Sequence, residues 1–107
     1  MTDKVESILG FAVRAGKVIY GIDNIEHLRK KRYVMLICNS LSERSVKKCI
    51  AVADSGRIPL LQIKNKLLEE IVHKPNCKAV AIGDKQMSQA ILKFRNDNYE
   101  VLTSEVK

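Results

Sequence analysis

Apolar residues recur along the chain in two spacings that alternate from one end to the other. Helical spacing (i, i+3, i+4, i+7) gives residues 3–15 one apolar face, and similar spacing returns in four later segments. Between these segments lie short, continuously apolar runs, which are typical of strands covered on both faces. This alternation predicts an α/β protein whose helices pack against both faces of a central sheet.

The predicted strands are short. The four main ones cover residues 17–20, 34–38, 60–63 and 79–82. Residues 99–102 form a weaker run, a marginal edge strand that follows a turn of Asn and Asp residues. We therefore expect a three-layer α/β/α sandwich around a central four-stranded mixed sheet, formed by residues 1–107 as a single domain.

Turn and capping residues predict where several helices begin and end. Gly16 and Gly56 are expected to end the first and third helices, because glycine accepts the left-handed backbone needed there. Ser40 and Glu43 have capping-box spacing, which predicts that the third helix begins at Ser40. Asp84 follows a buried strand, where α/β proteins often place catalytic groups, but a helix cap explains it more simply.

The composition indicates an anionic partner. The net charge is +7 and the isoelectric point is about 9.5, and nucleic acid is the commonest partner of such a chain. Aromatic residues make up 5% of the sequence and tryptophan is absent, which argues against a base-stacking platform for single strands. The sequence has neither a signal-peptide pattern nor an apolar run of the ~20 residues that a membrane span needs. We expect a cytoplasmic protein.

The residue types that commonly carry catalysis or bind metals lack the spacing that a catalytic or metal site requires. The three cysteines, Cys38, Cys49 and Cys77, lack a C-x-x-C pair, and Cys38 and Cys49 are expected to be buried as small apolar residues. His27 and His73 lie on different predicted elements, away from any metal-binding spacing. Nucleotide-binding and phosphate-loop motifs are absent. We therefore expect no enzyme activity, no metal and no cofactor.

The segment LGFAVRAGK at residues 9–17, with Gly21 and the elements after it, resembles the kink-turn-binding ribosomal proteins. This is the "L seven Ae" family, and the resemblance is strongest to its small bacterial members. It extends from about residue 4 to residue 95. The resemblance implies an α/β/α sandwich that binds structured RNA with sharp internal bends.

In that family the RNA is held where the first strand meets the second helix, by a Gly, a small residue, Asn and Glu. This chain has Gly21-Ile22-Asp23-Asn24 at that position. The family also places a Leu-Gly pair in a later loop that covers the RNA, and the corresponding pair here is Leu68-Glu69. The resemblance thus implies an RNA-binding surface built from these two regions.

The chemistry of this first region fits RNA recognition. Gly21 has no Cβ, so RNA can approach its backbone closely. Asp23 can accept hydrogen bonds from the amino groups of bases, and Asn24 can both donate and accept. Helix capping is the alternative explanation for both polar residues. The complete predicted RNA-binding set is Arg14, Lys17, Gly21, Ile22, Asp23, Asn24, His27, Lys64, Lys66 and Leu68.

Residues 29–32, Arg-Lys-Lys-Arg, are the densest basic run and follow the second predicted helix. They lie about 12–16 Å from Gly21 along that helix, at 1.5 Å per residue. They therefore fall outside the predicted contact set. A solvated helix end explains them more simply, and a secondary phosphate contact is the alternative.

Three functions remain open from the sequence. The first is a monomeric, non-catalytic, ribosomal-protein-like factor that binds structured ribosomal or regulatory RNA. The second is a protein-interaction module whose RNA site has decayed, which the altered motif at residues 21–24 and the pair Leu68-Glu69 favour. The third is a small nucleotide- or phosphate-handling α/β enzyme, which a deep pocket at Gly83 and Asp84 would support.

Overall fold

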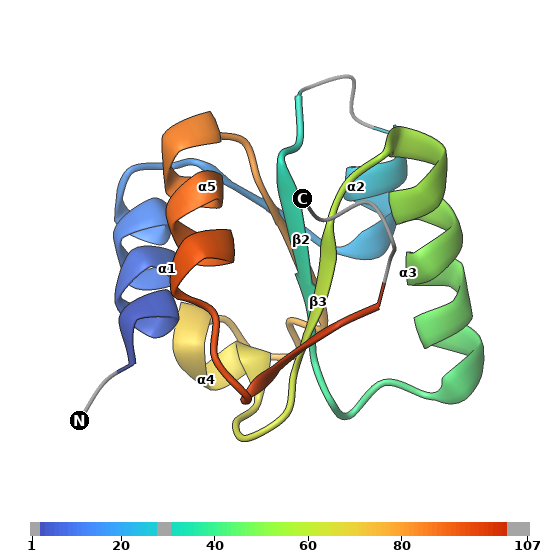
Figure 1. Cartoon of the computed structure of the whole chain (residues 1–107). Coiled ribbons are helices and arrows are strands. Elements are labelled where there is room, and N and C mark those ends of the chain that lie inside the picture. The colour runs from blue at the N-terminus through green and yellow to red at the C-terminus, as the bar shows by residue number, and fades with distance from the viewer. Residues whose placement is uncertain (1–2, 28–30, 103–107) are drawn as a thin grey trace.

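The computed structural model describes residues 3–27 and 31–102 of the 107-residue chain. Helices and strands alternate along these residues (Figure 1). In chain order they are α1 (Lys4–Arg14), β1 (Val18–Tyr20), α2 (Ile22–His27), β2 (Val34–Ile37), α3 (Glu43–Gly56), β3 (Leu60–Ile63), α4 (Leu68–Val72), β4 (Ala79–Ile82), α5 (Lys85–Phe94) and β5 (Tyr99–Val101).

The strands form one mixed sheet in the order β1-β4-β2-β3-β5. Strands β2 and β3 are parallel, whereas the other three pairs are antiparallel. The predicted mixed α/β fold is confirmed, but the prediction of four strands was wrong, because β5 is a fifth strand paired with β3. Tyr99 lies opposite Ile63 and is buried, so one anchored aromatic side chain stabilises an otherwise exposed edge strand.

Helices lie on both sides of this sheet (Figure 1). Helices α1, α4 and α5 share one apolar cluster, which includes Leu36 of β2. Helices α2 and α3 share the other cluster, which includes Met35 and Ile37 of the same strand. Every residue of β2 is buried. The unbroken apolar run in the sequence therefore reflects a strand covered on both faces.

The ends of α3 differ from the prediction. Ser42 rather than Ser40 is the N-cap, since its side chain accepts a hydrogen bond from the backbone N–H of Ser45 (3.2 Å). Gly56 is still helical, and the left-handed residue is Arg57 (φ 55°). The left-handed turn comes one residue later than expected because the backbone N–H of Arg57 donates to carbonyls in the last turn of α3.

The predictions for Gly16, Asp84, Cys38 and Cys49 are confirmed. Gly16 has φ +70° just after α1, and the Asp84 carboxylate caps α5 by accepting from the Met87 N–H (2.9 Å). Cys38 and Cys49 are buried. Within the described residues, no three His, Cys, Asp or Glu side chains gather as a metal site would require. None of the helices in residues 3–27 and 31–102 has the length and apolar character needed to span a bilayer.

Candidate nucleic-acid interface

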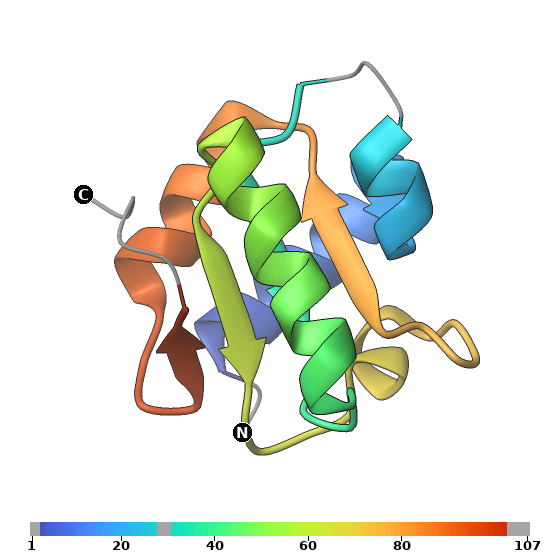
Figure 2. The ribbon, with the colours of Figure 1, turned by 90° about the vertical axis from the view of Figure 1, so that its right-hand side faces the viewer.

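The sheet topology brings distant loops together at one end of the sheet. Strands β1 and β2 end there, and β4, which is antiparallel to both, begins there; Figure 2 shows the start of β4 next to the loop that precedes it. The backbone N–H of Gly21 donates to the Ala79 carbonyl (2.9 Å), and the N–H of Cys38 donates to the Lys78 carbonyl (2.9 Å). The start of α2 is thereby fixed beside the loop at residues 74–78.

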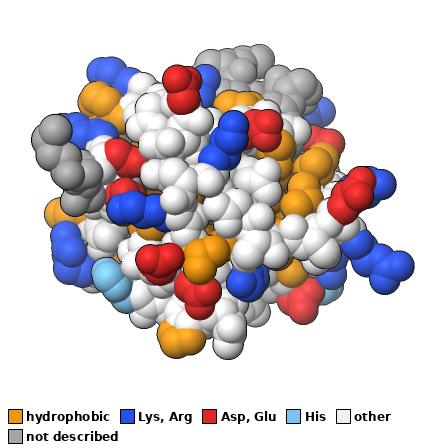
Figure 3. Space-filling model, turned by 90° about the horizontal axis from the view of Figure 1, so that it is seen from below, with side chains coloured by type: hydrophobic (Ala, Val, Ile, Leu, Met, Phe, Trp, Pro, Cys, Tyr) orange, Lys and Arg blue, Asp and Glu red, His pale blue; other side chains and the backbone are white. Residues whose placement is uncertain are grey.

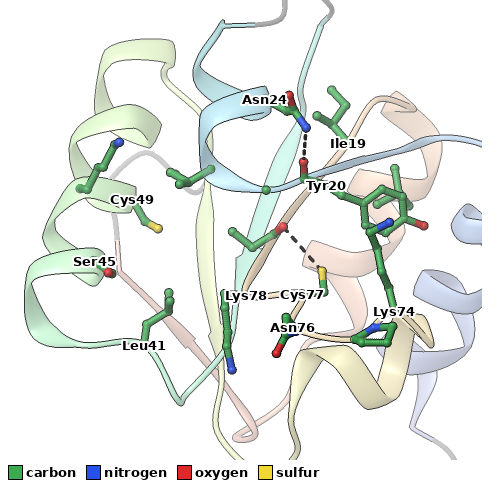
Figure 4. A pocket seen from close by; sticks show the side chains of 16 residues that line it. Ile19, Tyr20, Asn24, Leu41, Ser45, Cys49, Lys74, Asn76, Cys77 and Lys78 are labelled. Atoms are coloured by element: carbon green, nitrogen blue, oxygen red, sulfur yellow. Dashed lines mark hydrogen bonds between the residues drawn. The ribbon is translucent and has the colours of Figure 1, made fainter.

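A hollow of about 640 Å³ lies between this loop, the start of α2 and the first half of α3 (Figure 4). We name it the sheet-end hollow. Half-buried Ile22, one of the predicted contact residues, lies in its wall and packs on the cluster under α2 and α3. The polar residues of its lining are Asn24, Ser45, Lys48, Lys74, Asn76 and Lys78.

Gly21 has a backbone conformation that few other residues adopt. Its φ is +87°, in the left-handed region. A Cβ added to it would lie 3.9 Å from Asn24 Nδ2, with no closer neighbour. The position therefore requires glycine for its backbone angle, because the space beside it is open.

The polar side chains of Asp23 and Asn24 are exposed, and hydrogen bonds hold both of them in place. The side-chain amide of Asn24 donates to the Tyr20 carbonyl (2.8 Å), which fixes its orientation. The Asp23 carboxylate accepts from Lys48 Nζ of α3 (3.2 Å). The side chains of this pair are 77% and 49% exposed, so water weakens their attraction and a ligand can compete for either group.

Two further lysines border the hollow from the loop before β4. Lys74 Nζ lies 4.9 Å from the centre of the Tyr20 ring, and Lys78 Nζ donates to the Ser40 hydroxyl (2.9 Å). The loop is shaped by Glu69, whose carboxylate accepts from the backbone N–H of Asn76 (2.8 Å). Glu69 thus holds the loop beside the hollow.

The charged groups at this end do not form a uniform basic surface. Figure 3 views the molecule from this end, where basic and acidic side chains are interspersed with hydrophobic ones. Attraction of an anion would therefore depend on individually placed groups such as Lys48, Lys74 and Lys78, because neighbouring carboxylates reduce the general positive potential.

The ionisable uncharged side chains of the hollow stay protonated near neutral pH. Burial raises the pKa of Cys49 to about 11. Burial also raises the pKa of Tyr20 and of Cys77. Cys38 differs: burial raises its pKa, but hydrogen bonds from the Ser40 hydroxyl and from backbone N–H groups lower it overall. Cys38 is fully buried, so it offers no accessible nucleophile.

Arg14 and Lys17 lie away from the sheet-end hollow. Both precede β1, whereas Gly21 follows it, and three strand residues span about 10 Å. Lys17 instead borders a smaller hollow of about 210 Å³ with Lys31 and Gly83. The structure therefore separates the predicted set into groups at opposite ends of β1.

The remaining predicted residues have different surroundings. Lys64 and Lys66 are exposed, and Lys66 Nζ pairs with the Glu6 carboxylate (3.0 Å). Leu68 is fully buried in the cluster under α1, α4 and α5, so its side chain has no surface for a ligand. His27 is exposed at the last residue of α2 and lies 3.4 Å from the Glu26 carboxylate.

Of the basic run at residues 29–32, the structure describes Lys31 and Arg32, and residues 29 and 30 lie outside the part of the chain that it describes. Lys31 is exposed. The Arg32 guanidinium donates to the Ile25 carbonyl of α2. A cation bound to a carbonyl in the last turn of a helix satisfies a group that lacks an intrahelical partner.

Five polar residues of the hollow are missing from the sequence-based set. They are Ser45, Lys48, Lys74, Asn76 and Lys78. Pro75 and Asn76 precede a buried strand and indicate a loop, so the loop itself could be predicted from the sequence. Only the antiparallel pairing of β1 with β4 places this loop beside Gly21, and the order of strands cannot be read from hydrophobic spacing.

Comparison with known proteins agrees with this architecture. The model of the ribosomal protein L7Ae/L30e/S12e/Gadd45 family matches residues 3–92. A solved structure described as a protein with unknown function from Bacillus halodurans is similar, with a TM-score of 0.74 and 18% identity. That similarity covers 87% of this chain and 97% of the other, and shows a shared fold. No match was found among curated protein sequences.

Proposed function

The chain belongs to the ribosomal protein L7Ae/L30e/S12e/Gadd45 family, and on this basis we propose that it binds structured, kink-turn-like RNA. The family is one of non-catalytic, RNA-binding ribosomal proteins, and its model covers residues 3–92. The RNA would be ribosomal or regulatory. The protein would act on it as a cytoplasmic monomer that binds and positions the RNA without changing it chemically.

The observation that carries this proposal is the arrangement at the mouth of the sheet-end hollow. Asp23 and Asn24 are exposed there, at the start of a helix whose preceding glycine leaves the backbone open. A carboxylate accepts from exocyclic amino groups, and an amide both donates and accepts, so the two can read the edge of a base. A kinked RNA exposes such edges, whereas a regular A-form major groove is too deep and narrow.

The lysines around the hollow supply phosphate contacts. Lys48 pairs with Asp23 at 3.2 Å, so an RNA whose base meets Asp23 would bring its backbone near this cation. Lys74 and Lys78 border the hollow on the side of the loop before β4. Contacts of this kind strengthen binding at low salt and carry little sequence information. Specificity would come from Gly21, Asp23 and Asn24.

Other members of the predicted set have secondary roles in this proposal. An RNA that continues past β1 could place a phosphate near Lys17 or Arg14, which precede the strand. Lys64 and His27 are exposed, so they can contact an RNA that extends from the hollow. Leu68 takes no part, because its side chain is fully buried.

The test compares a kinked internal-loop RNA with an uninterrupted duplex of the same length in a gel-shift titration at moderate salt. We expect binding to the kinked RNA to survive excess duplex competitor, since charge-driven binding alone would be competed away. Asp23→Ala and Asn24→Ala should each weaken binding to the kinked RNA. Equal affinity for both RNAs would refute the proposed specificity, and unchanged binding by both variants would refute the site.

A further inference from the structure

A second surface lies on the opposite side of the sheet from α2 and α3, along the helices α1 and α5 (Figure 1). These helices pack side by side and leave a groove of about 460 Å³ between them. Ile8 and Phe11 of α1 and Met87 and Ala90 of α5 form its apolar lining. The groove is therefore an apolar channel that follows two helices.

Exposed apolar area is concentrated on these two helices. Phe11 is 58% exposed and Phe94 is 41% exposed. Of the large hydrophobic residues that the structure describes, Val101 is the only other one exposed to this degree, at 37%. Large apolar side chains gathered on one surface of a charged protein typically mark an interaction site.

Cations surround these rings. Lys4 Nζ lies 5.3 Å from the centre of the Phe94 ring, and Lys93 Nζ lies 5.5 Å from the same ring. The Arg14 guanidinium lies 5.9 Å from the centre of the Phe11 ring. The groove thus has an apolar floor and a positively charged border.

The carboxylates nearest in sequence are already bound elsewhere. Glu6 pairs with Lys66, and Asp3 accepts from the Tyr99 hydroxyl. Asp84 caps α5, and residues 85–94 contain no Asp or Glu. The positive charge at the border of the groove is therefore not balanced by acids of α1 or α5.

We propose that this groove binds an amphipathic helical segment of a partner protein, with apolar residues on one face and Asp or Glu beside them. Helices α1 and α5 have 11 and 10 residues, which correspond to about 15–17 Å. A partner helix of about three turns matches that length, and it would present apolar residues at i, i+4 and i+7. Its flanking carboxylates would meet Lys4, Arg14 and Lys93.

The same features argue against two other occupants. A second copy of this chain docked by the same face would bring the lysines and arginine of both copies together, which opposes association. An RNA strand would satisfy the cations, but it would leave the aliphatic floor formed by Ile8, Met87 and Ala90 without apolar contacts. An acidic amphipathic helix matches both the floor and the border.

This inference goes beyond the proposed RNA binding and does not depend on it. The groove and the sheet-end hollow are built on opposite faces of the sheet, by α1 and α5 and by α2 and α3 respectively. An RNA on one face leaves the other face free for a protein. The chain would then connect a bent RNA to a second protein.

The test uses two fluorescently labelled synthetic helices of about 14 residues, long enough to cover the groove at 1.5 Å per residue. Both carry Leu at i, i+4, i+7 and i+11, and one has Glu and the other Lys at the flanking positions. Fluorescence anisotropy at low salt, without RNA, gives their affinities for the full chain. We expect the acidic helix to bind at least tenfold more tightly than the basic helix.

Variants of the groove, each with a control variant elsewhere on the protein, test where the acidic helix binds. Phe11→Ser and Arg14→Gln should each weaken binding of the acidic helix at least fivefold. The controls Val101→Ser and Lys47→Gln remove a similarly exposed apolar group and a cation elsewhere, and should leave binding unchanged. Amide chemical shifts should change along α1 and α5.

Three results of the binding experiments would overturn the proposal. They are equal binding of the two peptides, shift changes confined to α2 and the loop before β4, and competition for the groove by a single-stranded RNA. Self-association of the chain through Phe11 in sedimentation would also contradict it. Failure of the RNA test leaves these readouts unaffected, so the two proposals can be refuted separately.

Discussion

Two glycines with positive φ offer a matched pair of substitutions at opposite ends of β1. Gly21 has φ +87° and Gly16 has φ +70°, and a Cβ on either would meet no atom closer than 3.9 Å. Alanine at either position therefore adds backbone strain without a steric clash. Only Gly21 lies at the proposed RNA-binding surface.

The expected loss of stability on replacing either glycine by alanine follows from the backbone angle. A left-handed conformation costs a non-glycine residue about 1–2 kcal/mol. Replacing glycine also reduces the entropy of the unfolded chain, which offsets about 0.4–1 kcal/mol of that cost. Gly21→Ala and Gly16→Ala should each lower the free energy of unfolding by about 1 kcal/mol. For a domain of this size that corresponds to a fall in Tm of about 4–8 °C.

RNA affinity should separate the two variants. The methyl group of Gly21→Ala would lie where a base or phosphate approaches the backbone, so we expect at least a tenfold loss of affinity, equivalent to about 1.4 kcal/mol. Gly16→Ala should bind as the parent protein does. Urea unfolding and gel-shift titration of the same samples measure both quantities.

Either of two outcomes would refute this reasoning. If Gly16→Ala weakens RNA binding as much as Gly21→Ala, the effect comes from general destabilisation and not from close approach of the RNA. If Gly21→Ala is destabilised by far more than Gly16→Ala, the space beside Gly21 is not open as the structure indicates.

Four further predictions test other features. Lys48→Gln should reduce the slope of log affinity against log salt by about 0.7–0.9 in RNA titrations, whereas the neighbouring Lys47→Gln, whose cation faces Glu43, should not. Tyr99→Phe should lower the free energy of unfolding by about 1.5–3 kcal/mol in urea, because its hydroxyl donates to the carboxylate that caps α1 (2.9 Å). Ser88→Ala should raise that free energy by about 1 kcal/mol, since the buried hydroxyl has no hydrogen-bond partner among the described residues; a loss of stability would contradict this. Burial raises the pKa of Cys49 from 9.0 to about 11, so the stability this thiol contributes is complete below pH 9.0 and is lost as the pH rises through about 11. The decline in unfolding free energy over that range should be smaller in Cys49→Ala.

The sequence predicted the elements that depend on local spacing. The strand at Leu60–Ile63 and the helical faces of α1, α3 and α5 follow directly from the periodicity of apolar residues. Strand β5 was predicted only as a marginal edge strand, because only Tyr99 of its three residues is buried. Its stability depends on the hydrogen bond from Tyr99 to Asp3, a contact between the two ends of the chain that spacing does not reveal.

The candidate site was predictable only in part. Gly21, Asp23 and Asn24 came from a local motif; Gly21 and Asn24 line the hollow, and Asp23 pairs with Lys48, which also lines it. Lys48 and Lys78 reach the same hollow through strand pairing and helix packing, which a single sequence does not specify. Arg14 and Lys17 are close to Gly21 in sequence, but an extended strand separates them in space.

The most direct test of the central proposal is the location of the bound RNA. Backbone amide shifts can be recorded while a kinked internal-loop RNA is added to the full chain. The account predicts changes at residues 21–24, at Lys48 and along residues 74–78, with none at the groove residues Ile8, Phe11, Met87 and Ala90. Changes confined to α1 and α5, or equal changes with an uninterrupted duplex, would contradict it.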